Sequence, residues 1–259
     1  MIARLPLFAL AVLAGVPDAA GAPDPAAWDA LLKEFVTAES RVDYARLKQQ
    51  GLARLDAYLA TVAAPWPHDL SPAARKAALL NAYNALTVRW IVAHYPVASI
   101  WRTSHPFTAA RHRVDGRSVS LDAIETELRQ LGDPRIHAAL VCASRSCPPL
   151  RREAYTADRL DRQLDENARA WLGDPALNEF DPAARSASVS RIFNWYGKDF
   201  GSVTAFLLRY APPGKAEFLR SSGARITYKP YRWGLNDTSD LGRDYSEAQF
   251  LLDRAKNAL

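Results

Sequence analysis

Two cysteines and a histidine lie close together in the chain, between Asp133 and Pro149. Pro148 and Pro149 follow Cys147, and their fixed φ angles suit the first turn of a helix, so we expect the Cys147 thiol at a helix N-terminus. There the helix dipole and the nearby Arg145 would lower the thiol pKa and favour the nucleophilic thiolate. His137, upstream in the same segment, is the candidate base.

This arrangement predicts a thiol-dependent hydrolase or acyltransferase that acts on peptide or amide bonds. Cys147 would be the nucleophile, and Arg145 with backbone amides of the Cys147 turn would stabilise an oxyanion. Asp199 is the acid that we expect to orient His137 if the three form a triad. The remaining histidines have weaker sequence contexts.

The segment 192–200, which contains that acid, also has four aromatic residues. Trp195 and Tyr196 are candidates for lining a groove that binds a sugar or a peptide, although such aromatics also form cores. Asn81 and Asn84 are a further signal, because they share one face of an otherwise apolar helix. Their amides either tie the helix to a neighbouring loop or bind a polar substrate.

The cysteines also allow readings without catalysis. Cys142 and Cys147 enclose four residues and could form a disulfide, which is common in exported proteins. The protein would then be a non-catalytic envelope protein that binds a peptide, a glycan or another envelope component, or a redox accessory protein. A zinc site has little support, because the spacing matches no zinc motif and no fourth ligand is evident. We therefore predict no metal.

The N-terminus has the organisation of a signal peptide. A short basic region ending at Arg4 precedes an apolar run at 5–16, and small residues follow at 19–22. The run is too short to span a bilayer. We expect cleavage near residue 22 and a periplasmic or secreted protein that does not span the membrane after cleavage.

Composition narrows the function further. The chain has 33 Lys and Arg, 28 Asp and Glu, and a formal charge of +5. These charges are scattered along the chain, so we predict no nucleic-acid partner. There is no phosphate-binding loop, no dinucleotide fingerprint and no serine nucleophile elbow, so we predict no cofactor. We expect a monomer.

Helical and strand patterns alternate irregularly along the chain. Helices are expected at 25–36, 44–63, 72–94, 120–131, 157–172, 203–210 and 215–221, and β structure in a hairpin at 111–119 and in strands at 136–142, 186–190 and 225–233. Ser71 and Pro72 mark the start of the 72–94 helix. The pattern predicts an α+β fold, in which residues 23–259 form a single domain of amphipathic helices around a small, largely antiparallel sheet.

Several segments together resemble the family named domain of unknown function 547. They are 80–87, 94–96, 120–125, 133–137, 142–150, 153–155, 192–196 with 199–200, and 230–236. The likeness runs from about residue 43 to 237, and it implies no activity, because none is attached to the family. A Cys and a His beside a helix and a small sheet are also similar to papain-like and transglutaminase-like enzymes, by analogy of fold alone.

Overall fold

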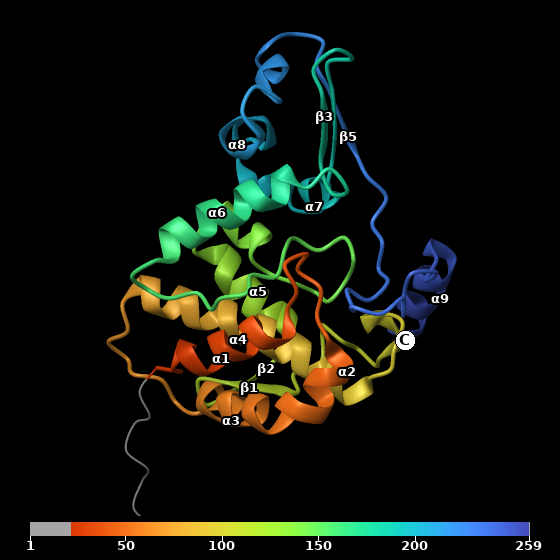
Figure 1. Ribbon diagram of the computed structural model, residues 1–259. Helices are drawn as coiled ribbons and strands as arrows, with labels where there is room; N and C mark the ends of the chain where they lie inside the picture. The colour runs from red at the N-terminus through yellow and green to blue at the C-terminus, as the bar shows by residue number, and fades with distance from the viewer. Residues whose placement is uncertain (1–21, 259) are drawn as a thin grey trace, which may run out of the picture.

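A central helix organises the molecule. In the computed structural model, which describes residues 22–258, α4 (Pro72–His94) starts where Ser71 accepts a hydrogen bond from the backbone of Ala74. Helices α1 (Pro25–Phe35), α3 (Leu52–Ala63) and α5 (Leu121–Gln130) pack against it (Figure 1). Most of α4 is buried, which explains why its sequence is apolar on nearly all sides.

The remaining elements complete two regions of the molecule. They are α2 (Tyr44–Arg46), η1 (Leu47–Gly51), η2 (Ile100–Arg102), β1 (His112–Val114), β2 (Arg117–Val119), η3 (Pro134–Ala138), α6 (Leu160–Gly173), β3 (Glu179–Asp181), β4 (Ser186–Val189), α7 (Ile192–Trp195), η4 (Gly197–Phe200), α8 (Val203–Tyr210), η5 (Glu217–Arg220), β5 (Arg225–Tyr228) and α9 (Glu247–Lys256). Most of the predicted helices are confirmed, and their ends lie within a few residues of the predicted ends. β3 and α9 have no counterpart among the predicted elements.

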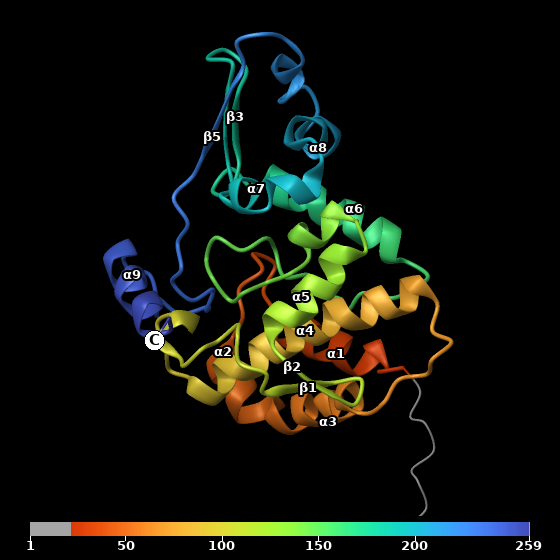
Figure 2. The same cartoon turned by 180° about the vertical axis from the view of Figure 1, so that it is seen from behind.

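Two small sheets contain the β structure of residues 22–258. β1 and β2 form the expected hairpin, with Asp115 and Gly116 at positive φ in its turn. β4 pairs antiparallel with β3 and parallel with β5. The fold is therefore α+β, as the sequence predicts. The strand expected at 225–233 ends at Tyr228, and the chain then runs as an extended segment toward α9 (Figures 1 and 2).

The core has two parts that meet at α6. The larger part lies around α4, and the smaller one lies between the C-terminal half of α6, β4, α7 and α8. Leu164 of α6 belongs to the first, and Trp171 belongs to the second. One continuous domain results, in which the segment between α5 and α6 packs mainly in the larger part and contributes Ala138 to the smaller one.

Two local predictions for the segment between α5 and α6 are wrong. Residues 136–142 form no strand: the Asp133 side chain accepts from the backbone of Arg135 and starts the short helix η3, after which the chain is irregular. No helix begins after Cys147 either. The side chain of Asn167 on α6 donates to the carbonyl of Pro149 at 3.2 Å, so the proline pair is held as an extended segment.

The predicted signal peptide falls outside the described residues except for Ala22, so it stays a prediction. Between residues 22 and 258, no helix combines the length and the apolar character that crossing a membrane requires.

Candidate functional site

Two buried asparagines on α4 hold the segment that carries the cysteines. The Asn84 side chain accepts from the backbone N–H of Val141 at 2.9 Å and donates to the carbonyl of Ala139 at 2.9 Å. Asn81 makes the same pair of bonds to the backbone of Tyr155, at 2.9 and 2.8 Å. Each amide therefore pairs with the backbone as a neighbouring strand would. This geometry favours the structural alternative for both asparagines over substrate binding.

The two cysteines face each other across a tight turn. Their Sγ atoms lie 2.8 Å apart, and both residues are free thiols in the structure. The backbone N–H groups of Cys142 and Ser144 both donate to Cys147 Sγ, at 3.1 and 3.3 Å. The Ser144 hydroxyl lies 3.2 Å from the same sulfur. The turn therefore supplies the donors that we expected from a helix N-terminus.

These hydrogen bonds give the two thiols different pKa values. Burial opposes ionisation of Cys147, but hydrogen bonds from Cys142, Ser144 and Tyr231 lower its pKa to about 7. The contact with Cys147, together with burial, raises the pKa of the Cys142 thiol well above its ordinary value. Near neutral pH the pair therefore holds one thiolate, stabilised on Cys147, and one thiol on Cys142.

His137 lies near the C-terminal end of η3, and its side chain pairs with that of Asp199. His137 Nε2 lies 2.8 Å from Asp199 Oδ2. Arg129 of α5 donates to both oxygens of Asp199, at 2.5 and 3.0 Å, and holds the pKa of this carboxyl below its ordinary value. Because the ionised carboxylate only accepts, we assign the proton of the neutral imidazole to Nε2. The other nitrogen, Nδ1, is then free to take up a proton.

Aromatic rings enclose this imidazole. Its ring centroid lies 4.4 Å from that of Tyr196 and 5.2 Å from that of Phe200. His137 is only 4% exposed, and burial lowers its pKa, although Asp199 opposes the shift. The side chain is therefore a neutral imidazole at neutral pH, in a fixed orientation.

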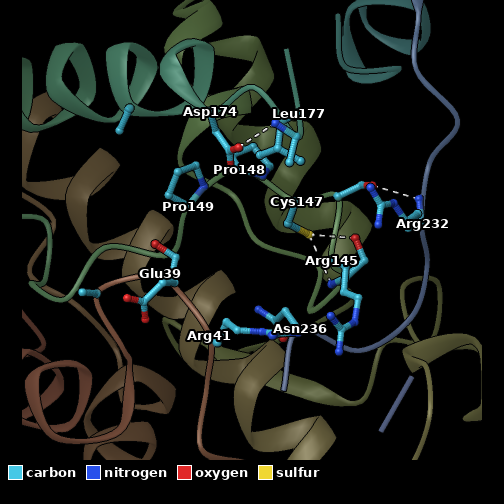
Figure 3. A pocket seen from close by; sticks show the side chains of 16 residues that line it. Glu39, Arg41, Arg145, Cys147, Pro148, Pro149, Asp174, Leu177, Arg232 and Asn236 are labelled. Carbon is cyan, nitrogen blue, oxygen red and sulfur yellow. Dashed lines mark hydrogen bonds between the residues drawn. The ribbon is translucent and has the colours of Figure 1, made fainter. Parts of the chain in front are cut away.

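Two cavities lie beside the cysteine turn. The aromatic cavity has a volume of about 680 Å³ and is bordered by Cys142, His137, Trp195, Tyr196 and Tyr231 among other residues, several of them aromatic. The arginine cavity has a volume of about 440 Å³ and is bordered by Cys147, Arg41, Arg145, Arg232 and Asn236 among others (Figure 3). Cys142 thus borders one cavity, and Cys147 borders the other.

This division separates residues that the sequence placed in one site. Cys147 and Arg145 border the arginine cavity, whereas His137 borders the aromatic cavity with Cys142. Within residues 22–258, no hydrogen bond joins His137 to either sulfur. The structure therefore places Cys142, the cysteine predicted only as a disulfide partner, on the same cavity as the histidine.

Tyr231 is a site residue that the sequence interpretation missed. Its hydroxyl lies 3.4 Å from Cys142 Sγ and 3.1 Å from the Ser144 hydroxyl, and it donates to Cys147 Sγ at 3.6 Å. Its ring packs against that of Trp195, with centroids 4.8 Å apart. The aromatic residues in 228–233 could have indicated a binding surface, but the sequence pattern predicts a closing strand there.

The sequence model of a family described as "Protein of unknown function, DUF547" matches residues 67–172. The chain is therefore similar to this family over residues 67–172, called the DUF547 segment below. The DUF547 segment contains both cysteines and His137, whereas Asp199 and Tyr231 lie beyond its end. Neither the curated proteins nor the solved structures gave a match.

The DUF547 segment therefore contains the two cysteines and His137, whereas Asp199 and Tyr231 come from later parts of the chain. Across residues 22–258, no three His, Cys, Asp or Glu side chains are grouped as metal ligands would be. The chemistry that these residues offer is that of a thiol, a neutral imidazole and an oriented carboxylate.

Proposed function

We propose that the protein is a thiol-dependent hydrolase or acyltransferase whose nucleophile is Cys142 and whose base is His137. The observation that carries the proposal is that Cys142 borders one cavity together with His137, whose imidazole pairs with Asp199. Its volume of about 680 Å³ is within the range of sites for small molecules and short peptide segments. Given the predicted signal peptide, the substrate would be a peptide or amide of the cell envelope.

The need for a base follows from the cysteine pair. Cys142 is a thiol near neutral pH, because the neighbouring Cys147 thiolate raises its pKa. His137 Nδ1 takes the thiol proton as Cys142 Sγ attacks the substrate carbonyl carbon and a C–S bond forms. The imidazolium then gives this proton to the leaving group as the bond to that group breaks. Asp199 holds the ring and stabilises its charged form.

The second half of the reaction reverses these roles. Water, or an acceptor amine or alcohol, gives a proton to His137 and attacks the thioester. The C–S bond then breaks, and the Cys142 sulfur takes the proton back from His137. Tyr231 is the candidate oxyanion donor, because its hydroxyl lies beside Cys142 Sγ at the aromatic cavity. Its O–H, which donates to Cys147 Sγ at 3.6 Å, would turn to the oxyanion. Arg145 borders the other cavity and is not assigned this role.

The walls of the cavity favour a substrate with an apolar or aromatic group. Trp195 is 44% exposed, although large aromatic side chains are usually buried, and its ring stacks on Trp233 with centroids 5.9 Å apart. Together with Tyr231 these rings form a surface on which a flat or apolar substrate group can pack.

The sulfur geometry favours one second candidate, thiol–disulfide exchange. Cys142 would attack a substrate disulfide and form a mixed disulfide, releasing one substrate thiolate. Cys147, 2.8 Å away, would then attack Cys142 Sγ, release the second thiolate and form the Cys142–Cys147 disulfide. The substrate disulfide takes up the two electrons that the two cysteines lose.

One experiment separates the two candidates. Reduced full-length protein is mixed with nitrophenyl esters and peptide nitroanilides that carry aromatic or aliphatic acyl groups, and in parallel with a peptide disulfide. Intact-protein and peptide mass spectrometry then locate the adducts. We expect turnover of an ester or anilide, an acyl group on Cys142, and losses of about 100-fold or more in Cys142→Ser and His137→Ala.

His68→Ala is the matched control, because it removes an exposed histidine that borders neither cavity. A mixed disulfide on Cys142 of the Cys147→Ser variant, without any acyl adduct in the wild type, would favour redox exchange. Undiminished turnover in Cys142→Ser would refute the thiol mechanism.

A further inference from the structure

We infer that the arginine cavity binds a small anion with a carboxylate or phosphate group, held by Arg41, Arg145, Arg232 and Asn236. This site is separate from the proposed reaction, because it borders Cys147, whereas the aromatic cavity borders Cys142. Its volume of about 440 Å³ suits a small molecule.

The first support is the shortage of partners for its arginines. Within residues 22–258, neither Arg41 nor Arg145 nor Arg232 forms an ion pair with a carboxylate. Arg135, by contrast, pairs with Asp133, Asp161 and Asp165. Guanidinium groups gathered at a cavity without carboxylate partners suit a carboxylate or phosphate that enters from solution.

Backbone hydrogen bonds fix two of these arginines at the cavity wall. The N–H of Arg145 donates to the carbonyl of Gly234 at 2.8 Å, and the N–H of Arg232 donates to Ser146 Oγ at 2.9 Å. The Arg145 guanidinium makes one hydrogen bond, to the carbonyl of Ser239 at 3.3 Å, and its buried Nε–H has no partner. Four of the five guanidinium N–H groups of Arg145 are therefore unused by the described residues.

Asn236 supplies an independent observation. Its side chain is one of the cavity walls but only 6% of the residue is exposed (Figure 3). Oδ1 accepts from the Tyr44 hydroxyl at 2.8 Å, whereas Nδ2 donates to no described residue. This N–H₂ group is open to the cavity, where an anion oxygen can accept from it beside the guanidinium groups.

Two carboxylates also border the cavity, and they leave it with a net positive charge. Asp174 is used locally, because its side chain accepts from the backbone of Ala176 at 2.8 Å. Glu39 is exposed to solvent. Three guanidinium groups outnumber these two carboxylates. Burial lowers the pKa of Arg145, and the surrounding cations Arg41, Arg243 and Arg232 lower it further, whereas Asp240 opposes them. The net shift is downward, and a bound anion would relieve this repulsion.

Asn236→Asp gives the sharpest test. Aspartate keeps an oxygen acceptor for the Tyr44 hydroxyl and replaces the N–H₂ group with a carboxylate oxygen, which cannot donate and which repels an anion. Calorimetric titrations with inorganic phosphate and with succinate measure binding to the full-length protein. We expect saturable binding of at least one of them, weakened about tenfold or more in Asn236→Asp and in Arg145→Gln. The anion that binds more tightly shows which group the cavity prefers.

Two further variants guard against misfolding and against general charge effects. Arg232 is exposed, so Arg232→Gln should fold normally and also bind more weakly. Arg225→Gln removes the same charge from an exposed position away from the cavity and should bind as the wild type does. The proposal is overturned if neither anion binds saturably, or if the three cavity variants bind like the wild type. These titrations need no catalytic activity, so their failure is distinct from failure of the proposed function.

Discussion

Cys147 Sγ accepts hydrogen bonds from the backbone N–H groups of both Cys142 and Ser144, at 3.1 and 3.3 Å. The turn thus forms a small anion site from its own backbone, and the anion that fills it is the Cys147 thiolate. This arrangement places the negative charge next to the second thiol rather than on it. Replacing Cys147 should therefore change the pKa of the Cys142 thiol strongly.

We predict that Cys147→Ser lowers the pKa of Cys142 toward the ordinary value of a thiol. The reason is that the hydrogen bond and the charge of Cys147 are what raise it, together with burial. The rate of alkylation by iodoacetamide, followed against pH with peptide mass spectrometry, measures the pKa of each thiol. In the wild type, the reactivity of Cys147 should rise through a pKa of about 7.

Two serines of the same turn provide a matched pair for this titration. Ser144→Ala should raise the pKa of Cys147, because the Ser144 hydroxyl stabilises the thiolate. Ser146→Ala should leave it unchanged, since its hydroxyl accepts from the backbone of Arg232 instead. Equal alkylation profiles for the two serine variants would contradict the assignment of the thiolate to Cys147.

The Asn84 amide should matter for stability rather than for substrate binding. Asn84→Ala removes two hydrogen bonds and leaves the backbone groups of Ala139 and Val141 buried without partners. We expect the free energy of unfolding to fall by about 2 to 5 kcal/mol, measured by urea denaturation. Asn194→Ala, at an exposed position, should change it by less than about 0.5 kcal/mol. A loss of activity at full stability would instead assign Asn84 to the active site.

Local signals predicted most of the helices. Ser71 and Ser120 accept hydrogen bonds from the backbone three residues later, as their sequence positions indicate. The apolar spacing in 44–63 likewise corresponds to a nearly continuous helical segment. These signals depend on neighbours within a few residues, so the chain itself shows them.

The cysteine segment could not be predicted in the same way. Its conformation depends on the amide of Asn84, which lies more than 50 residues away in sequence, and on Asn167 of α6. An apolar run such as 136–142 has the composition of a strand, but these side-chain contacts take the place of strand partners. The pairing of His137 with Asp199 was proposed from residue type, whereas only the fold shows that Cys142, rather than Cys147, shares its cavity.

Substitutions of Asp199 and of Arg129 should shift the pKa of His137 in opposite directions. The hydrogen bond and charge of Asp199 raise the pKa of His137, whereas the charge of Arg129 lowers it. Asp199→Asn should therefore lower the pKa of the imidazole further, and Arg129→Gln should raise it. Nuclear magnetic resonance of the histidine side chain against pH measures both. Under the proposed function, Asp199→Asn should also reduce turnover, by about 100-fold or more. Shifts of the same sign in the two variants would contradict this arrangement.

Stability in acid should depend on His112, which no proposed reaction uses. This histidine is buried at β1, its Nε2 has no hydrogen-bond partner, and burial with the nearby Arg111 lowers its pKa to about 4. The unfolded chain, with an ordinary histidine pKa of about 6.5, binds the proton more readily than the folded chain between these two values. The free energy of unfolding should therefore fall as the pH drops from about 6.5 toward 4, by up to about 3 kcal/mol from this residue.

His112→Phe should flatten that decline, because phenylalanine keeps an aromatic ring near Trp90 and has no proton to bind. Urea denaturation at several pH values between 4 and 7 measures the slope for both proteins. His137 also has a lowered pKa and remains in both, so the difference between the slopes isolates His112. His68→Phe, at an exposed position, is the matched control and should keep the wild-type slope. If His112→Phe keeps it as well, His112 is protonated in the folded protein and its burial does not govern acid stability.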